Sequence, residues 1–215
     1  MQHYTDILFD LDGTLTDSSG GITDCFRRAM EAFGYSCPSA EELKGQIIGP
    51  PIEASMRHYG VAEDTIDAMT REFRVHYNDH GWCNNRVYDG IPQMLKRLFD
   101  AGFRMSLATS KPEHMAVAVL EHFGLSQYFE KICGAVLDGS RDKKEEVIAY
   151  LLKNCGALEN AVMVGDSAFD ITGAKAHGIP GIGVSWGYGS VSDMQQAGAI
   201  AIAHDPEALW DLLNK

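Results

Sequence analysis

The sequence predicts an α/β protein with an open parallel sheet and an inserted helical domain. Three observations support this fold class: brief continuous apolar runs, amphipathic helical segments between them, and one long stretch with helical patterning alone. Continuous apolar runs are typical of central strands in a parallel sheet, because helices cover such strands on both faces.

Six brief runs rich in Ile, Val, Leu and Ala are the expected strands: 7–9, 105–108, 132–136, 162–164, 182–184 and 200–202. The segments between most of them carry apolar residues three or four positions apart, for example Ile91, Met94, Leu95 and Leu98. Regular alternation of strand and helix predicts crossover connections and therefore parallel pairing.

Residues 17–86 interrupt this alternation, because they show helical patterns and no convincing strand. Two apolar stripes stand out, one formed by Ile22, Cys25, Phe26, Ala29, Met30 and Phe33, the other by Ile66, Met69, Phe73 and Tyr77. The stretch is entered and left through turn-rich segments, 18–21 and 81–85. We therefore expect a core formed by 1–16 and 87–215 and a helical cap domain at 17–86.

Composition excludes several classes of protein. The net charge of −12 and the pI of about 5.0 disfavour a nucleic-acid-binding surface or an anionic membrane as a partner. No apolar run approaches the ~18 residues of a membrane span. The five cysteines are scattered without Cys-x-x-Cys spacing, which indicates reduced thiols and a cytoplasmic protein.

Acidic residues follow two of the expected strands. Asp10 and Asp12 come directly after 7–9, with Gly13 permitting a tight turn, and Asp166 and Asp170 follow 162–164. Ligands gather at the carboxyl ends of parallel strands, so the two clusters are expected to converge on one site. Mg²⁺ is the cation that suits a few carboxylates together with phosphate oxygens.

Hydroxyl and ammonium groups complete the set. Thr109 and Ser110 follow the strand expected at 105–108, where hydroxyls and backbone amides suit phosphate oxygens, and Lys143 and Lys144 open a helix before 162–164. Each feature alone is common, since Asp-x-Asp is often a solvated loop and Thr or Ser is often a helix cap. Their occurrence together, in this order, indicates a phosphate-handling site.

The set resembles the haloacid dehalogenase (HAD) superfamily of phosphohydrolases, in the subgroup with a helical cap after the first motif. The segments 49–53 (Gly-Pro-Pro-Ile-Glu) and 137–141 (Leu-Asp-Gly-Ser-Arg) resemble its phosphoglycolate phosphatase and 5′-nucleotidase-like branch. The resemblance spans essentially the whole chain. It implies a Rossmann-like core and a Mg²⁺-dependent phosphatase that hydrolyses a small phosphorylated metabolite.

The resemblance also implies a role for each residue. Asp10 would be the nucleophile that forms an aspartyl phosphate, and Asp12 the general acid and base. Thr109, Ser110 and Lys144 would bind the phosphoryl group. Asp10, Asp12 (through its backbone carbonyl) and Asp166 would bind the metal, and Asp170 would orient its surroundings. Lys143 is an alternative to Lys144 that the sequence leaves open.

Other interpretations remain open at this level. The same machinery serves phosphosugar mutases and pyrophosphatases, and a phospho-accepting signalling module also combines acidic residues, Thr and Lys. The loop 185–189 (Ser-Trp-Gly-Tyr-Gly) is expected to be a glycine-rich connection with a packed Trp, or else a border of the site. The substrate is not determined, because specificity in such a fold depends on cap loops.

Overall fold

The computed structural model describes residues 4–44, 46–48, 51–155, 158 and 160–214. The chain divides into two compact units, 1–16 with 87–215 and 17–86. Gly49 and Pro50 of the 49–53 segment lie outside the described residues.

The first unit contains a six-stranded parallel sheet in the order β5-β4-β1-β6-β7-β8. The strands are β1 (Asp6–Phe9), β4 (Arg104–Pro112), β5 (Lys131–Ala135), β6 (Ala161–Gly165), β7 (Gly181–Val184) and β8 (Ala201–Ala203). All four residues of β1 and all five of β6 are buried, as the continuous apolar runs predict. The predicted α/β fold class is confirmed.

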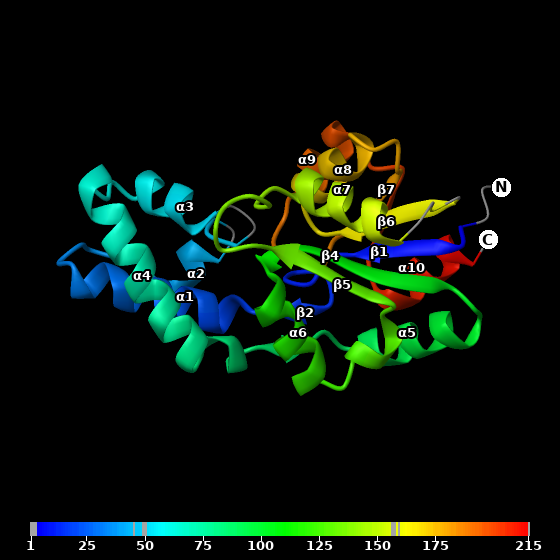
Figure 1. The fold of residues 1–215 in the computed structure, drawn as a ribbon, viewed down its shortest axis with the longest axis horizontal. Helices are drawn as coiled ribbons and strands as arrows, with labels where there is room; N and C mark the ends of the chain where they lie inside the picture. The colour runs from blue at the N-terminus through cyan, green and yellow to red at the C-terminus, as the bar shows by residue number, and fades with distance from the viewer. Residues whose placement is uncertain (1–3, 45, 49–50, 156–157, 159, 215) are drawn as a thin grey trace. The chain divides into compact units, whose positions relative to one another are not determined.

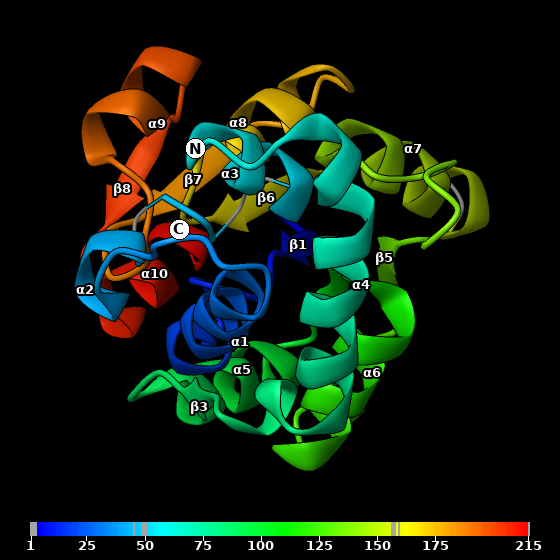
Figure 2. The ribbon, with the colours of Figure 1, turned by 90° about the vertical axis from the view of Figure 1, so that its left-hand side faces the viewer.

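Helices cover both faces of this sheet (Figures 1 and 2). One layer contains α7 (Lys144–Cys155), α8 (Ala168–Lys175) and α9 (Val191–Ala197). The other contains α5 (Ile91–Asp100), α6 (Glu113–His122) and α10 (Pro206–Leu213), with the 3₁₀ turn η2 (Ser126–Tyr128). Because each crossover places a helix between parallel neighbours, the carboxyl ends of all six strands lie along one edge.

The second unit is helical. It comprises α1 (Ser19–Ala32), α2 (Ala40–Leu43), α3 (Ile52–His58), α4 (Glu63–Asp79) and the 3₁₀ turn η1 (Gly81–Cys83). The α4 stripe of Ile66, Met69, Phe73 and Tyr77 is buried, and so is most of the α1 stripe. Phe33, by contrast, follows α1 as its C-cap residue and is 38% exposed, because the helix ends one residue before it. No helix among the described residues is long and apolar enough to cross a bilayer.

The structure differs from the expected strands in two places. The expected strand at 105–108 continues as β4 to Pro112, with an irregular register between Ala108 and Pro112 where pairing with β5 resumes at Ala135. Two-residue strands, β2 (Thr16–Asp17) and β3 (Arg86–Val87), also pair at the ends of the 17–86 stretch. Such short strands leave no periodic signal in a sequence.

Candidate active site

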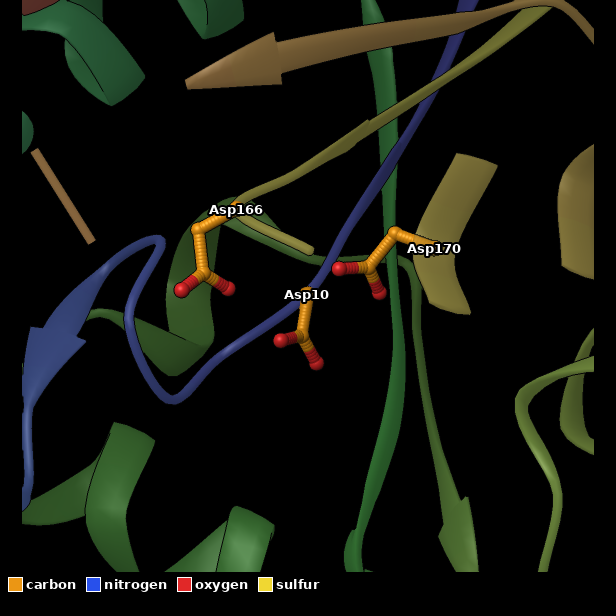
Figure 3. Close-up of side chains that lie close together, drawn as sticks. All are labelled: Asp10, Asp166 and Asp170. Atoms are coloured by element: carbon orange, nitrogen blue, oxygen red, sulfur yellow. The ribbon is translucent and has the colours of Figure 1, made fainter. Parts of the chain in front are cut away.

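Three buried carboxylates converge at the carboxyl edge of the sheet (Figure 3). Asp10 directly follows β1, Asp166 directly follows β6, and Asp170 lies in the first turn of α8. One oxygen from each lies within 4.8 Å of the others. Since β1 and β6 are hydrogen-bonded neighbours, with Phe9 level with Val164, the first two carboxylates are brought together by strand register.

Lys144 supplies a positive charge within this cluster. Its Nζ lies 2.6 Å from Oδ1 of Asp10, 2.8 Å from Oδ1 of Asp170 and 2.8 Å from the carbonyl oxygen of Ala108. The side chain is 5% exposed. Lys143 is exposed, because α7 begins at Lys144 and directs the two neighbouring side chains to different sides.

The start of α7 is set by a contact between residues that are close together in the sequence. Oε2 of Glu146 accepts hydrogen bonds from the backbone N–H groups of Asp142 and Lys143, at 2.8 and 3.0 Å. These N–H groups precede the first helical turn and have no helical partner of their own. The contact therefore fixes the point at which the helix begins, and with it the placement of Lys144.

Burial and mutual repulsion perturb these groups. Burial raises the pKa of Asp166 to about 8, and the Asp170 and Asp10 carboxylates add to this effect, while the backbone N–H groups of Tyr188 and Gly189 oppose it. Burial also raises the pKa of Asp10 to about 6, against the opposing charge of Lys144. For Lys144, burial alone would lower the pKa, but Asp10 and Asp170 outweigh it and raise the pKa. Three carboxyl groups thus share one lysine, and their mutual repulsion disfavours the charged form of Asp10 and Asp166.

Asp12 does not join the three carboxylates. Its side chain is paired with Lys111 from β4, whose Nζ lies 2.8 Å from Oδ2 and 3.1 Å from Oδ1. Thr109 is buried on the same irregular part of β4, and its Oγ1 accepts a hydrogen bond of 3.2 Å from the backbone N–H of Lys111. Ser110 is half-buried beside it. The predicted residues therefore lie at the carboxyl edge of the sheet, and Lys111 lies there with them as the partner of Asp12.

The loop 185–189 contacts Asp166 directly. Oδ2 of Asp166 accepts hydrogen bonds from the backbone N–H groups of Tyr188 (2.7 Å) and Gly189 (3.3 Å). The indole Nε1 of Trp186 donates a 3.0 Å hydrogen bond to the carbonyl oxygen of Thr14, which anchors the loop to the turn after β1. The loop thus borders the site, as the second of the two sequence interpretations holds.

Two glycines permit the close approach of these segments. At Gly13, whose φ is +90°, an added Cβ would lie 2.3 Å from Oδ2 of Asp166. At Gly187 it would lie 2.4 Å from both Oδ2 of Asp166 and the carbonyl oxygen of Gly13. Residues with a side chain would therefore displace the Asp166 carboxylate.

The sequence assigned no role in the site to Lys111, and it gave the 185–189 loop only as the second of two interpretations. Lys111 could have been predicted to lie near the site, because it directly follows Thr109 and Ser110 in the sequence. For the loop the only signal was its glycine content after a strand. Contacts between residues 166 and 188 depend on the pairing of β6 with β7, which a motif search does not supply.

Known proteins resemble this chain in sequence and in fold. The sequence profile of the family described as haloacid dehalogenase-like hydrolase matches residues 7–184. A crystal structure of a predicted phosphatase from Clostridium acetobutylicum is 37% identical, with a TM-score of 0.93 over 99% of both chains.

Curated relatives carry several names. The tyrosine-protein kinase PtkA of Mycobacterium tuberculosis is 42% identical over 92% of this chain and 68% of its own length. A 5′-nucleotidase of Pseudomonas aeruginosa is 38% identical over 94% of this chain and 89% of its own. A phosphoglycolate phosphatase of Agrobacterium fabrum is 30% identical over 86% and 82%.

Acidic groups at two adjacent strand ends of an open parallel sheet, with a buried lysine among them, form a site suited to phosphoryl transfer. With a profile match over most of its length, this chain belongs to the haloacid dehalogenase-like hydrolase family.

Proposed function

We propose that this protein is a Mg²⁺-dependent phosphatase that hydrolyses a small phosphomonoester through an aspartyl phosphate on Asp10. The observation that carries the proposal is the cluster itself, in which Asp10, Asp166 and Asp170 meet with Lys144 at 2.6 Å from the Asp10 carboxylate. Phosphoryl transfer depends chiefly on positioning and charge neutralisation, and the cluster supplies a carboxylate nucleophile beside an ammonium group and further carboxylates that suit a cation.

The donor set fits Mg²⁺. It consists of hard carboxylate oxygens, without sulfur or imidazole among the clustered groups. Its three carboxylates outnumber the one lysine, which contacts two of them. Asp10 and Asp166 would hold the ion with the backbone carbonyl of Asp12, while Asp170 would orient Lys144. The ion would neutralise phosphoryl oxygens and so assist both halves of the reaction.

In the first half-reaction, Oδ of Asp10 attacks phosphorus and the ester bond breaks, with Asp12 giving its proton to the departing oxygen. In the second, a water molecule attacks phosphorus and Asp12 accepts the proton of that water. The bond between Asp10 and phosphorus then breaks, which releases phosphate and restores the carboxylate. Thr109, Ser110 and Lys144 hold the phosphoryl oxygens throughout.

A panel of phosphate esters tests this proposal. Phosphoglycolate, nucleoside monophosphates and sugar phosphates are assayed for phosphate release with Mg²⁺ and with EDTA, and ranked by kcat/KM. We expect release from at least one class of monoester, lost in EDTA and restored by Mg²⁺. Isomerisation of a hexose phosphate without phosphate release would indicate a mutase, and cleavage of pyrophosphate alone would indicate a pyrophosphatase.

Substitution of Gly187 tests the support that the 185–189 loop gives to Asp166. Gly187→Ala is expected to weaken Mg²⁺ binding by at least about tenfold, the scale on which groups that orient metal ligands act. The measurement is the rise in melting temperature (Tm) with increasing Mg²⁺ concentration.

Tyr188→Phe is the control for Gly187→Ala, because it retains the backbone N–H that Asp166 accepts. It should bind Mg²⁺ as the wild type does. Equal Mg²⁺ affinity in Gly187→Ala and the wild type would show that the loop does not orient the ligand.

A second candidate function is transfer of a phosphoryl group to tyrosine in another protein, favoured by the 42% identity to PtkA. The same carboxylates would serve if the final acceptor were a phenol in place of water. Incubation with ATP labelled in the γ-phosphate and a tyrosine-containing protein separates the two functions. Labelled phosphotyrosine favours the kinase, and free phosphate from small esters favours the phosphatase.

A further inference from the structure

Lys111 is a buried charged residue for which the mechanism above has no role. Its side chain is 3% exposed and its Nζ contacts both oxygens of Asp12, at 2.8 and 3.1 Å. Lysine is almost never buried to this extent without a charged partner, because desolvation of an ammonium group is costly. The pair with Asp12 is therefore a built feature of the site.

The pair ties the loop after β1 to the neighbouring strand. Lys111 lies on β4, which pairs with β1 so that Phe9 is level with Leu107. Its backbone N–H is fixed by the 3.2 Å bond to Oγ1 of Thr109. Burial restrains the Lys111 ammonium group, since its side chain is 3% exposed, whereas the Asp12 side chain is 16% exposed and follows β1 in a loop.

The pair also separates Asp12 from the other carboxylates. Asp10, Asp166 and Asp170 bring their oxygens within 4.8 Å of one another, and Asp12 is not among them. Without Lys111 the Asp12 carboxylate would lose this restraint, and the positive charge of a cation held by Asp10 and Asp166 would attract it. It would then be misplaced for proton transfer.

We propose that Lys111 is a positioning residue that holds the Asp12 carboxylate where it accepts a proton from the attacking water. The inference rests on the proposed phosphatase function and concerns its second half-reaction. There the oxygen of water bonds to phosphorus, the Asp10–phosphorus bond breaks with its electron pair returning to the Asp10 carboxylate, and the proton of the water passes to Asp12. Loss of Lys111 therefore slows hydrolysis of the aspartyl phosphate.

Formation of the aspartyl phosphate is insensitive to Asp12 when the leaving group needs no proton. p-Nitrophenyl phosphate provides such a leaving group, since p-nitrophenolate departs unprotonated. For this substrate kcat/KM reports the steps up to departure of the leaving group, whereas kcat includes hydrolysis of the phosphoenzyme. The two constants thus separate the two half-reactions.

The experiment compares the wild type, Lys111→Met and Lys111→Arg with p-nitrophenyl phosphate and Mg²⁺. For Lys111→Met we expect kcat to fall by about 10²-fold, the lower range for loss of general base catalysis, while kcat/KM changes by less than about threefold. Rapid mixing should show one equivalent of p-nitrophenolate released before slow turnover. Lys111→Arg retains the charge and should recover most of the lost kcat.

A parallel fall in kcat and kcat/KM without a burst would overturn the inference, since it would indicate a role in substrate binding or folding. An unchanged kcat would overturn it as well. If the melting temperature shows that Lys111→Met does not fold, Lys111→Gln takes its place in the same test. Absence of Mg²⁺-dependent hydrolysis in the wild type would instead contradict the proposed function.

Discussion

Asp10→Asn is expected to lower kcat by more than about 10⁴-fold, the scale on which loss of a nucleophile acts, while the protein remains folded. The amide has the shape of the carboxylate but cannot form the aspartyl phosphate. The fold should tolerate the change, because it removes one negative charge from a cluster where burial raises the pKa of Asp10 to about 6. Phosphate release and the melting temperature are the two measurements.

Asp6→Asn is the matched control for Asp10→Asn. Asp6 is also buried on β1, but at the opposite end of the strand, where its Oδ2 accepts a 2.7 Å hydrogen bond from Arg104. This variant should lose some stability and keep its activity. Mg²⁺-dependent turnover in Asp10→Asn close to the wild-type rate would refute the nucleophile assignment.

Lys144→Met is expected to reduce kcat by about 10²–10³-fold, the range measured for removal of one group that stabilises transition-state charge. The variant should also melt at a lower temperature, because Asp10 and Asp170 lose the ammonium group that lies 2.6 and 2.8 Å from their oxygens. Steady-state assays at saturating Mg²⁺ and a thermal melt measure the two effects.

Lys143→Met is the matched control for Lys144→Met, since it makes the same substitution at the neighbouring exposed position. It should leave kcat within about twofold, because exposed charges contribute little. The opposite ranking, with Lys143→Met the more damaging, would show that Lys143 and not Lys144 acts in the reaction. The pair of variants thus settles by activity the choice that the sequence left open.

Much of the fold could be predicted because parallel strands buried on both faces are continuously apolar. The expected runs at 7–9, 162–164 and 182–184 fall within β1, β6 and β7, with boundaries that differ by one residue at most. The apolar stripe on α4 was visible for a related reason, since a helix that buries one face repeats its apolar residues every three to four positions.

The end of β4 could not be predicted. The apolar run stops at Ala108, but the strand continues through Thr109, Ser110 and Lys111 because its backbone pairs again with β5 beyond an irregular register. Polar residues on a strand next to a site give no apolar signal. Their inclusion is decided by hydrogen bonds to a neighbouring strand.

The sequence by itself determined the alternation of strands and helices and the types of residue at the strand ends, since both depend on local patterns of apolar and acidic side chains. Only the tertiary structure decided which of two adjacent lysines enters the cluster, that Asp12 pairs with Lys111, and that backbone amides from 188–189 hold Asp166. These contacts join residues that are distant in the chain. Their geometry depends on strand register, on the residue at which a helix begins and on the close approach that glycine allows.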